Sequence, residues 1–134
     1  MFITATCSGG NTTTSEPPTP TQTQDSGNLP DLTSIPLGEA LSSGKPTLAE
    51  FGWRTCTPCK MMKPILEELA IEYEDKLNVV IVEVYEHMDL AREYQIMAIP
   101  TQIFFDSGGK EVTRHMGFWP KEEIIAQLNK MVIE

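Results

Sequence analysis

Short apolar runs and longer amphipathic segments alternate along most of this chain. The segments 46–52 and 78–84 predict strands, and the second, a nearly continuous apolar run (Asn-Val-Val-Ile-Val-Glu-Val), is typical of a strand covered on both faces in a parallel sheet. Two further runs, 103–105 and 111–116, flank the turn-forming segment 106–110 and predict a β-hairpin. The pattern therefore predicts a sheet that ends in an antiparallel pair.

A long amphipathic helix is predicted after the first strand. From Cys59 to about Asp75 the apolar residues fall on one face of a 3.6-residue period, and the charged residues lie largely elsewhere. The apolar face consists of Met62, Leu66, Leu69, Ala70 and Tyr73.

Shorter helices are predicted on either side of this core. Residues 32–41 suggest a short strand edge and then a helix that ends near Ser43 and Gly44, and 88–94 suggests another helix. Pro120 opens a last helix. The inner face of that helix holds Ile124, Ile125, Leu128, Met131 and Val132. The predicted order is an initial helix followed by βαβαββα, which is an α/β fold.

The first 28 residues have a different composition from the rest. Residues 8–28 are rich in Thr, Ser and Pro and carry almost no large apolar side chain, so burial cannot offset the entropy of ordering them. We therefore expect a disordered leader or tether over 1–28 and one domain over 29–134. The segment Phe2–Cys7 resembles the end of a bacterial lipoprotein signal, in which the cysteine becomes a lipidated N-terminus. The alternative is an ordinary leader in which Cys7 is incidental.

Composition narrows the possible functions. A chain of 134 residues with 40% hydrophobic content can bury a core as one domain without disulfide staples. Its formal net charge of −9 disfavours nucleic acid as a partner, because phosphate backbones are bound by basic patches.

The most informative motif is Cys56-Thr57-Pro58-Cys59, which lies between the first strand and the long helix. Two thiols at this spacing can close a small disulfide ring, so the motif predicts a redox dithiol. Unpaired N–H groups at the start of a helix stabilise a thiolate, the nucleophilic form of cysteine. We expect Cys56 to attack, Cys59 to resolve the resulting mixed disulfide, and Pro58 to occupy the first helical position.

Two other interpretations of the motif remain open. A zinc site would need a second pair of ligands, and the remaining candidates are the isolated Cys7, His87 and His115. A purely structural disulfide would close too short a loop to add much stability. We therefore expect neither a metal nor another cofactor, and we expect both histidines to face solvent or to cap helices.

The stretch 51–64, from Phe51 to Pro64, resembles the active-site segment of the thioredoxin family, including the lysine after the second cysteine. The resemblance covers about residues 29–134. It implies a thioredoxin fold, a central mixed sheet flanked by helices that ends in a hairpin and a C-terminal helix. It also implies that Ile99-Pro100-Thr101 forms the loop opposite the dithiol, with a cis proline and with substrate hydrogen bonds from the backbone of Ile99.

Glu50 is a candidate catalytic residue. It alternates with apolar neighbours and precedes Cys56 by six positions, where the family often carries a buried carboxylate that relays a proton to the second cysteine. A carboxyl desolvated beneath the dithiol has a raised pKa and can take the proton from Cys59. The alternative is that Glu50 points to solvent at the end of the sheet.

The chain departs from the family pattern around the cysteines. Thr55 stands where the family usually has Trp, Trp53 replaces a small residue, and Thr57 replaces the usual Gly. By resemblance, the residues expected to meet substrate are Trp53, Thr55, Thr57, Pro58, Ile99, Pro100 and Gly117. Trp119 is either a contact aromatic on the same face or a partly buried cap of the last helix.

Three functions remain. The first is a reductant of protein disulfides, and the second is an oxidase or isomerase on a similar scaffold, which the absence of a histidine between the cysteines disfavours. The third is a non-catalytic module that binds a partner through its Pro100 face. We expect the protein to be a monomer whose substrates are disulfide-containing proteins. A reductase or a membrane thiol carrier is the expected source of electrons. If Cys7 is lipidated, the domain hangs outside a bacterial membrane; if the leader is unprocessed, it is a cytoplasmic protein.

Overall fold

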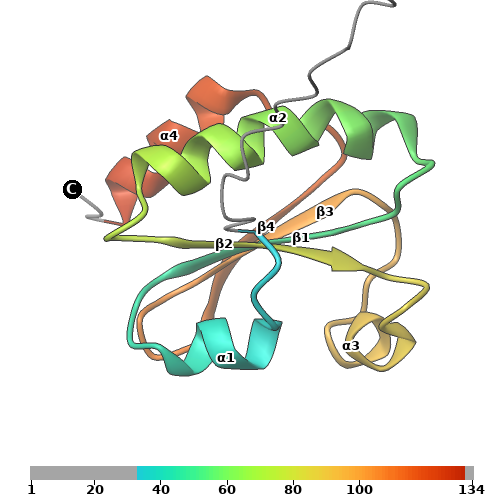
Figure 1. Ribbon diagram of the computed structural model, residues 1–134, viewed down its shortest axis with the longest axis horizontal. Coiled ribbons are helices and arrows are strands. Elements are labelled where there is room, and N and C mark those ends of the chain that lie inside the picture. Colours follow the sequence, from blue (N-terminus) through green and yellow to red (C-terminus); the bar gives the residue numbers. More distant parts are fainter. Residues whose placement is uncertain (1–32, 132–134) are drawn as a thin grey trace, which may run out of the picture.

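The computed structural model describes residues 33–131, which form a sheet covered by helices on both faces. The elements are α1 (Leu37–Ser42), β1 (Thr47–Gly52), α2 (Thr57–Glu72), β2 (Asn78–Glu83), α3 (Met88–Glu93), β3 (Thr101–Phe105), β4 (Glu111–Met116) and α4 (Lys121–Lys130). Figure 1 shows α2 and α4 on one face of the sheet and α1 and α3 on the other. The leader with Cys7 and the terminal Val132 lie outside the described residues. Within residues 33–131 no helix is long and apolar enough to cross a membrane.

The sheet has the strand order β2-β1-β3-β4. β1 pairs with β2 in parallel, while β3 is antiparallel to both β1 and β4. The predicted order of elements and the terminal hairpin are therefore confirmed. In the hairpin turn, Asp106 Oδ1 accepts hydrogen bonds from the backbone N–H groups of Gly108 and Lys110, and Gly109 adopts a φ of +79°.

Two predicted boundaries differ from the structure. The long helix begins at Thr57 instead of Cys59, because Cys56 occupies the N-cap position, so Pro58 is its second residue and not its first. The strand edge expected before α1 is absent from residues 33–36, where the chain turns. The Ile81 N–H of β2 donates to the Thr33 carbonyl at 3.1 Å, and Pro36 has no N–H with which to extend a ladder.

Alternation along β1 divides the core into two halves. Leu48 faces α2 and α4, whereas Ala49 and Phe51 face α1 and α3. The first half contains the predicted helix faces, with Met62, Leu66, Leu69 and Ala70 from α2 and Ile124 and Leu128 from α4. The same parity turns Glu50 and Gly52 toward α2, and this places the candidate site between the sheet and the start of that helix.

Candidate active site

The two cysteines lie at the N-terminus of α2. The backbone turns directly from β1 into the helix, because the Cys56 N–H donates to the Trp53 carbonyl at 3.0 Å and the Lys60 N–H donates to the Cys56 carbonyl at 3.0 Å. Cys56 and Cys59 form a disulfide with a Cα–Cα distance of 5.2 Å. Cys56 is partly exposed, whereas Cys59 is only 7% exposed. A substrate therefore reaches Cys56 more readily than Cys59.

The sulfur of Cys56 also caps the helix. Its Sγ accepts a hydrogen bond from the Cys59 N–H at 3.3 Å. This N–H is one of the donors that have no partner within a helix. A donor aimed at Sγ stabilises negative charge on that sulfur.

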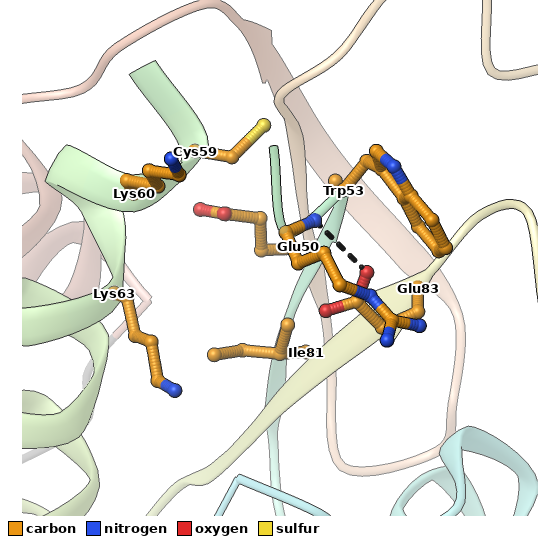
Figure 2. Close-up of a pocket in the computed structure, with 9 residues that line it drawn as sticks. Glu50, Trp53, Cys59, Lys60, Lys63, Ile81 and Glu83 are labelled. Atoms are coloured by element: carbon orange, nitrogen blue, oxygen red, sulfur yellow. Dashed lines mark hydrogen bonds between the residues drawn. The ribbon is translucent and has the colours of Figure 1, made fainter. Parts of the chain in front are cut away.

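Glu50 lies beneath the dithiol and does not face solvent. The residue is 2% exposed, and its side chain extends from β1 toward the first turn of α2 (Figure 2). Burial raises the pKa of the Glu50 carboxyl to about 8. A hydrogen bond from Gln102 opposes this rise and the nearby charge of Glu83 adds to it. The group is therefore a carboxylic acid that titrates near neutral pH.

Gly52 leaves open the space between the buried carboxyl and the buried thiol. A Cβ at position 52 would lie 3.1 Å from Cys59 Sγ and 3.4 Å from Glu50 Oε1. Both reactive atoms therefore lie within contact distance of the same point, and Oε1 is the carboxyl oxygen on the Cys59 side. The absence of a side chain here allows the carboxyl and the thiol to approach each other.

A cavity of about 270 Å³ connects this pair to the surface beside α2. It is lined by Glu50, Gly52, Trp53, Arg54, Cys59, Lys60, Lys63, Ile81 and Glu83. The cavity contains charged groups of both signs, and the Glu83 carboxylate accepts a hydrogen bond from the Arg54 backbone N–H at 3.2 Å. The Glu50 carboxyl therefore shares a cavity with charged side chains of both signs.

Trp53 belongs to an aromatic cluster at the rim of this cavity. Its ring packs edge-on against Tyr85 at 4.9 Å between centroids, and the Arg54 guanidinium lies 4.4 Å from the Trp53 ring centroid. Arg54 is also paired with Glu86. Tyr85 is 63% exposed, so the cluster presents an aromatic surface next to Cys56.

The segments that carry Pro100 and Gly117 lie side by side. The Ile99–Pro100 peptide bond is cis, and the Pro100 carbonyl accepts a hydrogen bond from the Gly117 N–H at 2.7 Å. Gly117 has a φ of +91°, a conformation that favours glycine. Pro100 is buried, while Ile99 and Gly117 are partly exposed.

Comparison with known proteins assigns this arrangement to a family. The family model described as Thioredoxin matches residues 35–130, which include both cysteines, Glu50 and Pro100. The chain belongs to the thioredoxin family. Thioredoxin from Alicyclobacillus acidocaldarius subsp. acidocaldarius is 40% identical over 97 residues, covering 72% of this chain and 91% of that protein. Thioredoxin from Staphylococcus aureus strain Mu50 is 42% identical over 83 residues, covering 62% of this chain and 79% of that protein.

A third relative combines two activities in its name. The bifunctional thioredoxin reductase/thioredoxin of Mycobacterium leprae strain TN is 40% identical over 96 residues, which is 72% of this chain and 21% of that protein. Family membership and the Cys56–Cys59 disulfide together identify the present thioredoxin-family protein as a thiol–disulfide oxidoreductase that reduces protein disulfides.

The structure places the other predicted site residues around the dithiol with different exposures. Thr55 and Thr57 are exposed, and Pro58 is partly exposed on the first turn of α2. Trp119 is 8% exposed and packs in the core half that faces α2 and α4, where its backbone N–H donates to Met62 Sδ at 3.3 Å. Trp119 is therefore buried in the core, and the N-cap position of the last helix is held by Pro120.

The two histidines occupy different surroundings. His87 is exposed at the N-cap position of α3 without a side-chain capping bond. His115 stacks on Trp119 at 4.7 Å between ring centroids. Among residues 33–131 no group of three His, Cys, Asp or Glu side chains is placed to hold a metal ion.

Two site residues were missed in the sequence. Gln102 lies directly opposite Glu50 in β3, is fully buried, and donates from Nε2 to Glu50 Oε2 at 3.4 Å. Its signal was an amide inside the apolar strand Thr-Gln-Ile-Phe-Phe. Gly52 was visible as a glycine inside a strand, a position that often marks close approach of another group.

Replacing Gly52 with alanine should disturb the contact between Cys59 and Glu50. The added Cβ meets Cys59 Sγ at 3.1 Å, so the thiol or the helix must shift, and we expect a loss of about 1–3 kcal/mol in the free energy of unfolding. Urea denaturation measures this loss. The matched control is Gly38→Ala in α1, where nothing lies within 4 Å of the new Cβ and a gain of about 0.5–1 kcal/mol is expected. Equal stability of Gly52→Ala and the wild type would show that the site is not tightly packed.

The buried carboxyl should make stability fall with rising pH. Glu50 titrates at about 8 in the folded chain and near 4.5 when unfolded, so between these values the folded state holds a proton that the unfolded state has released. The free energy of unfolding should therefore decrease from about pH 4.5 to about pH 8, and Glu50→Gln should remove this decrease and be more stable at high pH by a few kcal/mol. Denaturation over a pH series tests this. Glu74→Gln, at an exposed position, should retain the wild-type slope.

Proposed function

We propose that the protein reduces disulfides with Cys56 as the attacking thiol, Cys59 as the resolving thiol and Glu50 as the proton acceptor. The observation that carries this proposal is the buried carboxyl of Glu50, which shares the gap at Gly52 with the sulfur of Cys59. The greater exposure of Cys56 and its capping bond support its role as nucleophile.

The reaction takes two steps. The Cys56 thiolate attacks one sulfur of the substrate disulfide, the substrate S–S bond breaks, and the second substrate sulfur leaves as a thiolate that takes up a proton. Cys59 then loses its proton to Glu50 and attacks Cys56 Sγ, which releases the first substrate sulfur as a thiol after protonation. The protein ends with the Cys56–Cys59 disulfide, and the substrate gains two electrons and two protons.

The environment of Glu50 suits it to the second step. A general base works best when its pKa lies near the working pH, and burial brings the pKa of Glu50 to about 8. An ordinary exposed carboxylate would be too weak a base to accept a thiol proton. After transfer, the cavity beside α2 offers the proton a route to solvent.

Substrate binding is proposed for the surface around Cys56. The residues concerned are Trp53, Thr55, Thr57, Pro58, Ile99, Pro100 and Gly117. Support comes from the exposed threonines that flank Cys56 and from the aromatic cluster at the cavity rim. The hydrogen bond between Pro100 and Gly117 supports their acting as one surface. An extended segment with an apolar side chain near its disulfide would suit this surface.

A reductase is the proposed source of electrons. The name of the Mycobacterium leprae relative, a bifunctional thioredoxin reductase/thioredoxin, supports this choice, because there a domain similar to this chain is joined to a reductase. A membrane thiol carrier is the alternative if Cys7 carries a lipid tether. The proposed domain over 29–134 is supported by the family match to residues 35–130.

Substitution of the resolving cysteine should trap the substrate. In a Cys7→Ser background, Cys59→Ser should accumulate a covalent adduct with a disulfide-linked test peptide, because Cys56 attacks and nothing displaces the bound half. Intact mass measures the adduct. Cys56→Ser should give little adduct since the remaining thiol is buried. An adduct that forms only in Cys56→Ser would reverse the assigned roles.

The direction of the reaction should be visible in the reduction potential. We expect the Cys56–Cys59 couple near the thioredoxin value of about −270 mV when it is equilibrated with glutathione or dithiothreitol buffers. A value of about −120 to −180 mV would instead indicate an oxidase or isomerase. Failure to form an internal disulfide would leave only a binding module.

A further inference from the structure

We infer that Gln102 is a positioning residue that directs the exchangeable proton of Glu50 to Oε1, the oxygen on the Cys59 side. The inference rests on the proposed role of Glu50 as proton acceptor. It assigns a function to an amide that neither the dithiol motif nor the family match singles out.

The register of the sheet puts the amide beside the carboxyl. Glu50 pairs directly with Gln102 across the antiparallel β1–β3 ladder. Gln102 is fully buried, and the next residue on the same face of β3, Phe104, belongs to the apolar core. An amide in such surroundings is expensive unless it hydrogen-bonds, and the carboxyl of Glu50 is the partner that it has.

The hydrogen bond makes the two carboxyl oxygens unequal. Oε2 accepts from Gln102 Nε2 at 3.4 Å, while Oε1 lies at the Gly52 gap near Cys59 Sγ. An oxygen that faces an N–H donor cannot hold its own proton in that direction, because two hydrogens would then oppose each other. The proton lost by Cys59 is therefore taken up at Oε1, where it forms the new O–H bond as the S–H bond breaks.

The other orientation of the amide is less favourable. Gln102 Oε1 has no hydrogen-bond partner among the described residues. Turning the amide would let this oxygen accept from a protonated Oε2, but it would take the N–H donor away from Glu50 and set two acceptor oxygens against each other once the carboxyl is ionised. The carboxylate that receives the proton from Cys59 is therefore stabilised only by the observed orientation. The observed orientation, with Nε2 toward Glu50, therefore keeps the proton on the side of the thiol.

Other charged groups share the cavity with Glu50 and would remain in a Gln102 variant. They are Lys60 and Lys63 from α2, Glu83 from β2 and Arg54 from the connecting loop, all of which line the cavity. Arg54 is engaged by Glu86 through its side chain and by Glu83 through its backbone. A change of pH profile on altering Gln102 is thus attributable to the amide.

The test is Gln102→Met, which retains the length of the side chain without its donor. In a full-length Cys7→Ser background, the reduced protein is mixed with Ellman's reagent. Attack by Cys56 releases one thionitrobenzoate and leaves the second one disulfide-bonded to Cys56. Stopped-flow absorbance then follows release of this second thionitrobenzoate as Cys59 attacks Cys56. We expect this step to be about three- to tenfold slower at neutral pH and its pH profile to move to the alkaline side, because the carboxylate has lost a hydrogen bond. Rates should converge with the wild type at high pH.

Two further variants separate the possible outcomes. Phe104→Leu, on the same strand and face, should lower stability while keeping the wild-type pH profile, since Phe104 pairs with Leu48 and has no group that can hydrogen-bond to Glu50. Glu50→Gln should slow the step, and adding Gln102→Met to it should cause no further change. A Gln102→Met profile that superimposes on the wild type, with Glu50→Gln still slow, would overturn the inference alone. A Glu50→Gln variant as fast as the wild type would overturn the proposed function, and the inference with it.

Discussion

The alternation of side chains along β1 is the constraint on which this site depends. A strand sends every second residue to the same face, so the parity that buries Leu48 against α2 also buries Glu50 and turns Gly52 toward Cys59. The apolar packing between β1 and α2 thus also removes the Glu50 carboxyl from water. A shift of one residue in this strand would turn Phe51 toward α2 and Glu50 toward α1 and α3, so that neither side chain would lie on its present face of the sheet.

Much of the fold could be predicted because its signals are local. The spacing of apolar residues in α2, the β-branched run of β2 and the turn at Asp106 each depend on neighbours in sequence. The order of elements followed from these signals. The start of α2 was less accessible, because it is fixed by the sulfur of Cys56 acting as a cap, and cysteine is not among the residues that usually signal a helix start.

The site was predictable only in part, for a different reason. Cys56, Cys59 and Glu50 could be named from spacing and from a family resemblance, but their surroundings depend on which strands become neighbours. Gln102 lies 52 positions from Glu50 and meets it only because β3 inserts between β1 and β4 in antiparallel register. No local pattern encodes that pairing. The burial of Trp119 likewise follows from the docking of α4 beside α2, which brings the backbone N–H of Trp119 to Met62.

The capping bond at Cys56 joins the redox chemistry to the folding of the helix. The Cys59 N–H stabilises the Cys56 sulfur, and by thermodynamic reciprocity the charge on that sulfur must stabilise the first turn of α2 by the same free energy. The stability of the first turn of α2 and the redox state of the dithiol are therefore coupled. Any partner that tightens or loosens the beginning of α2 will change how readily the protein gives up its electrons, even if it never touches a sulfur atom.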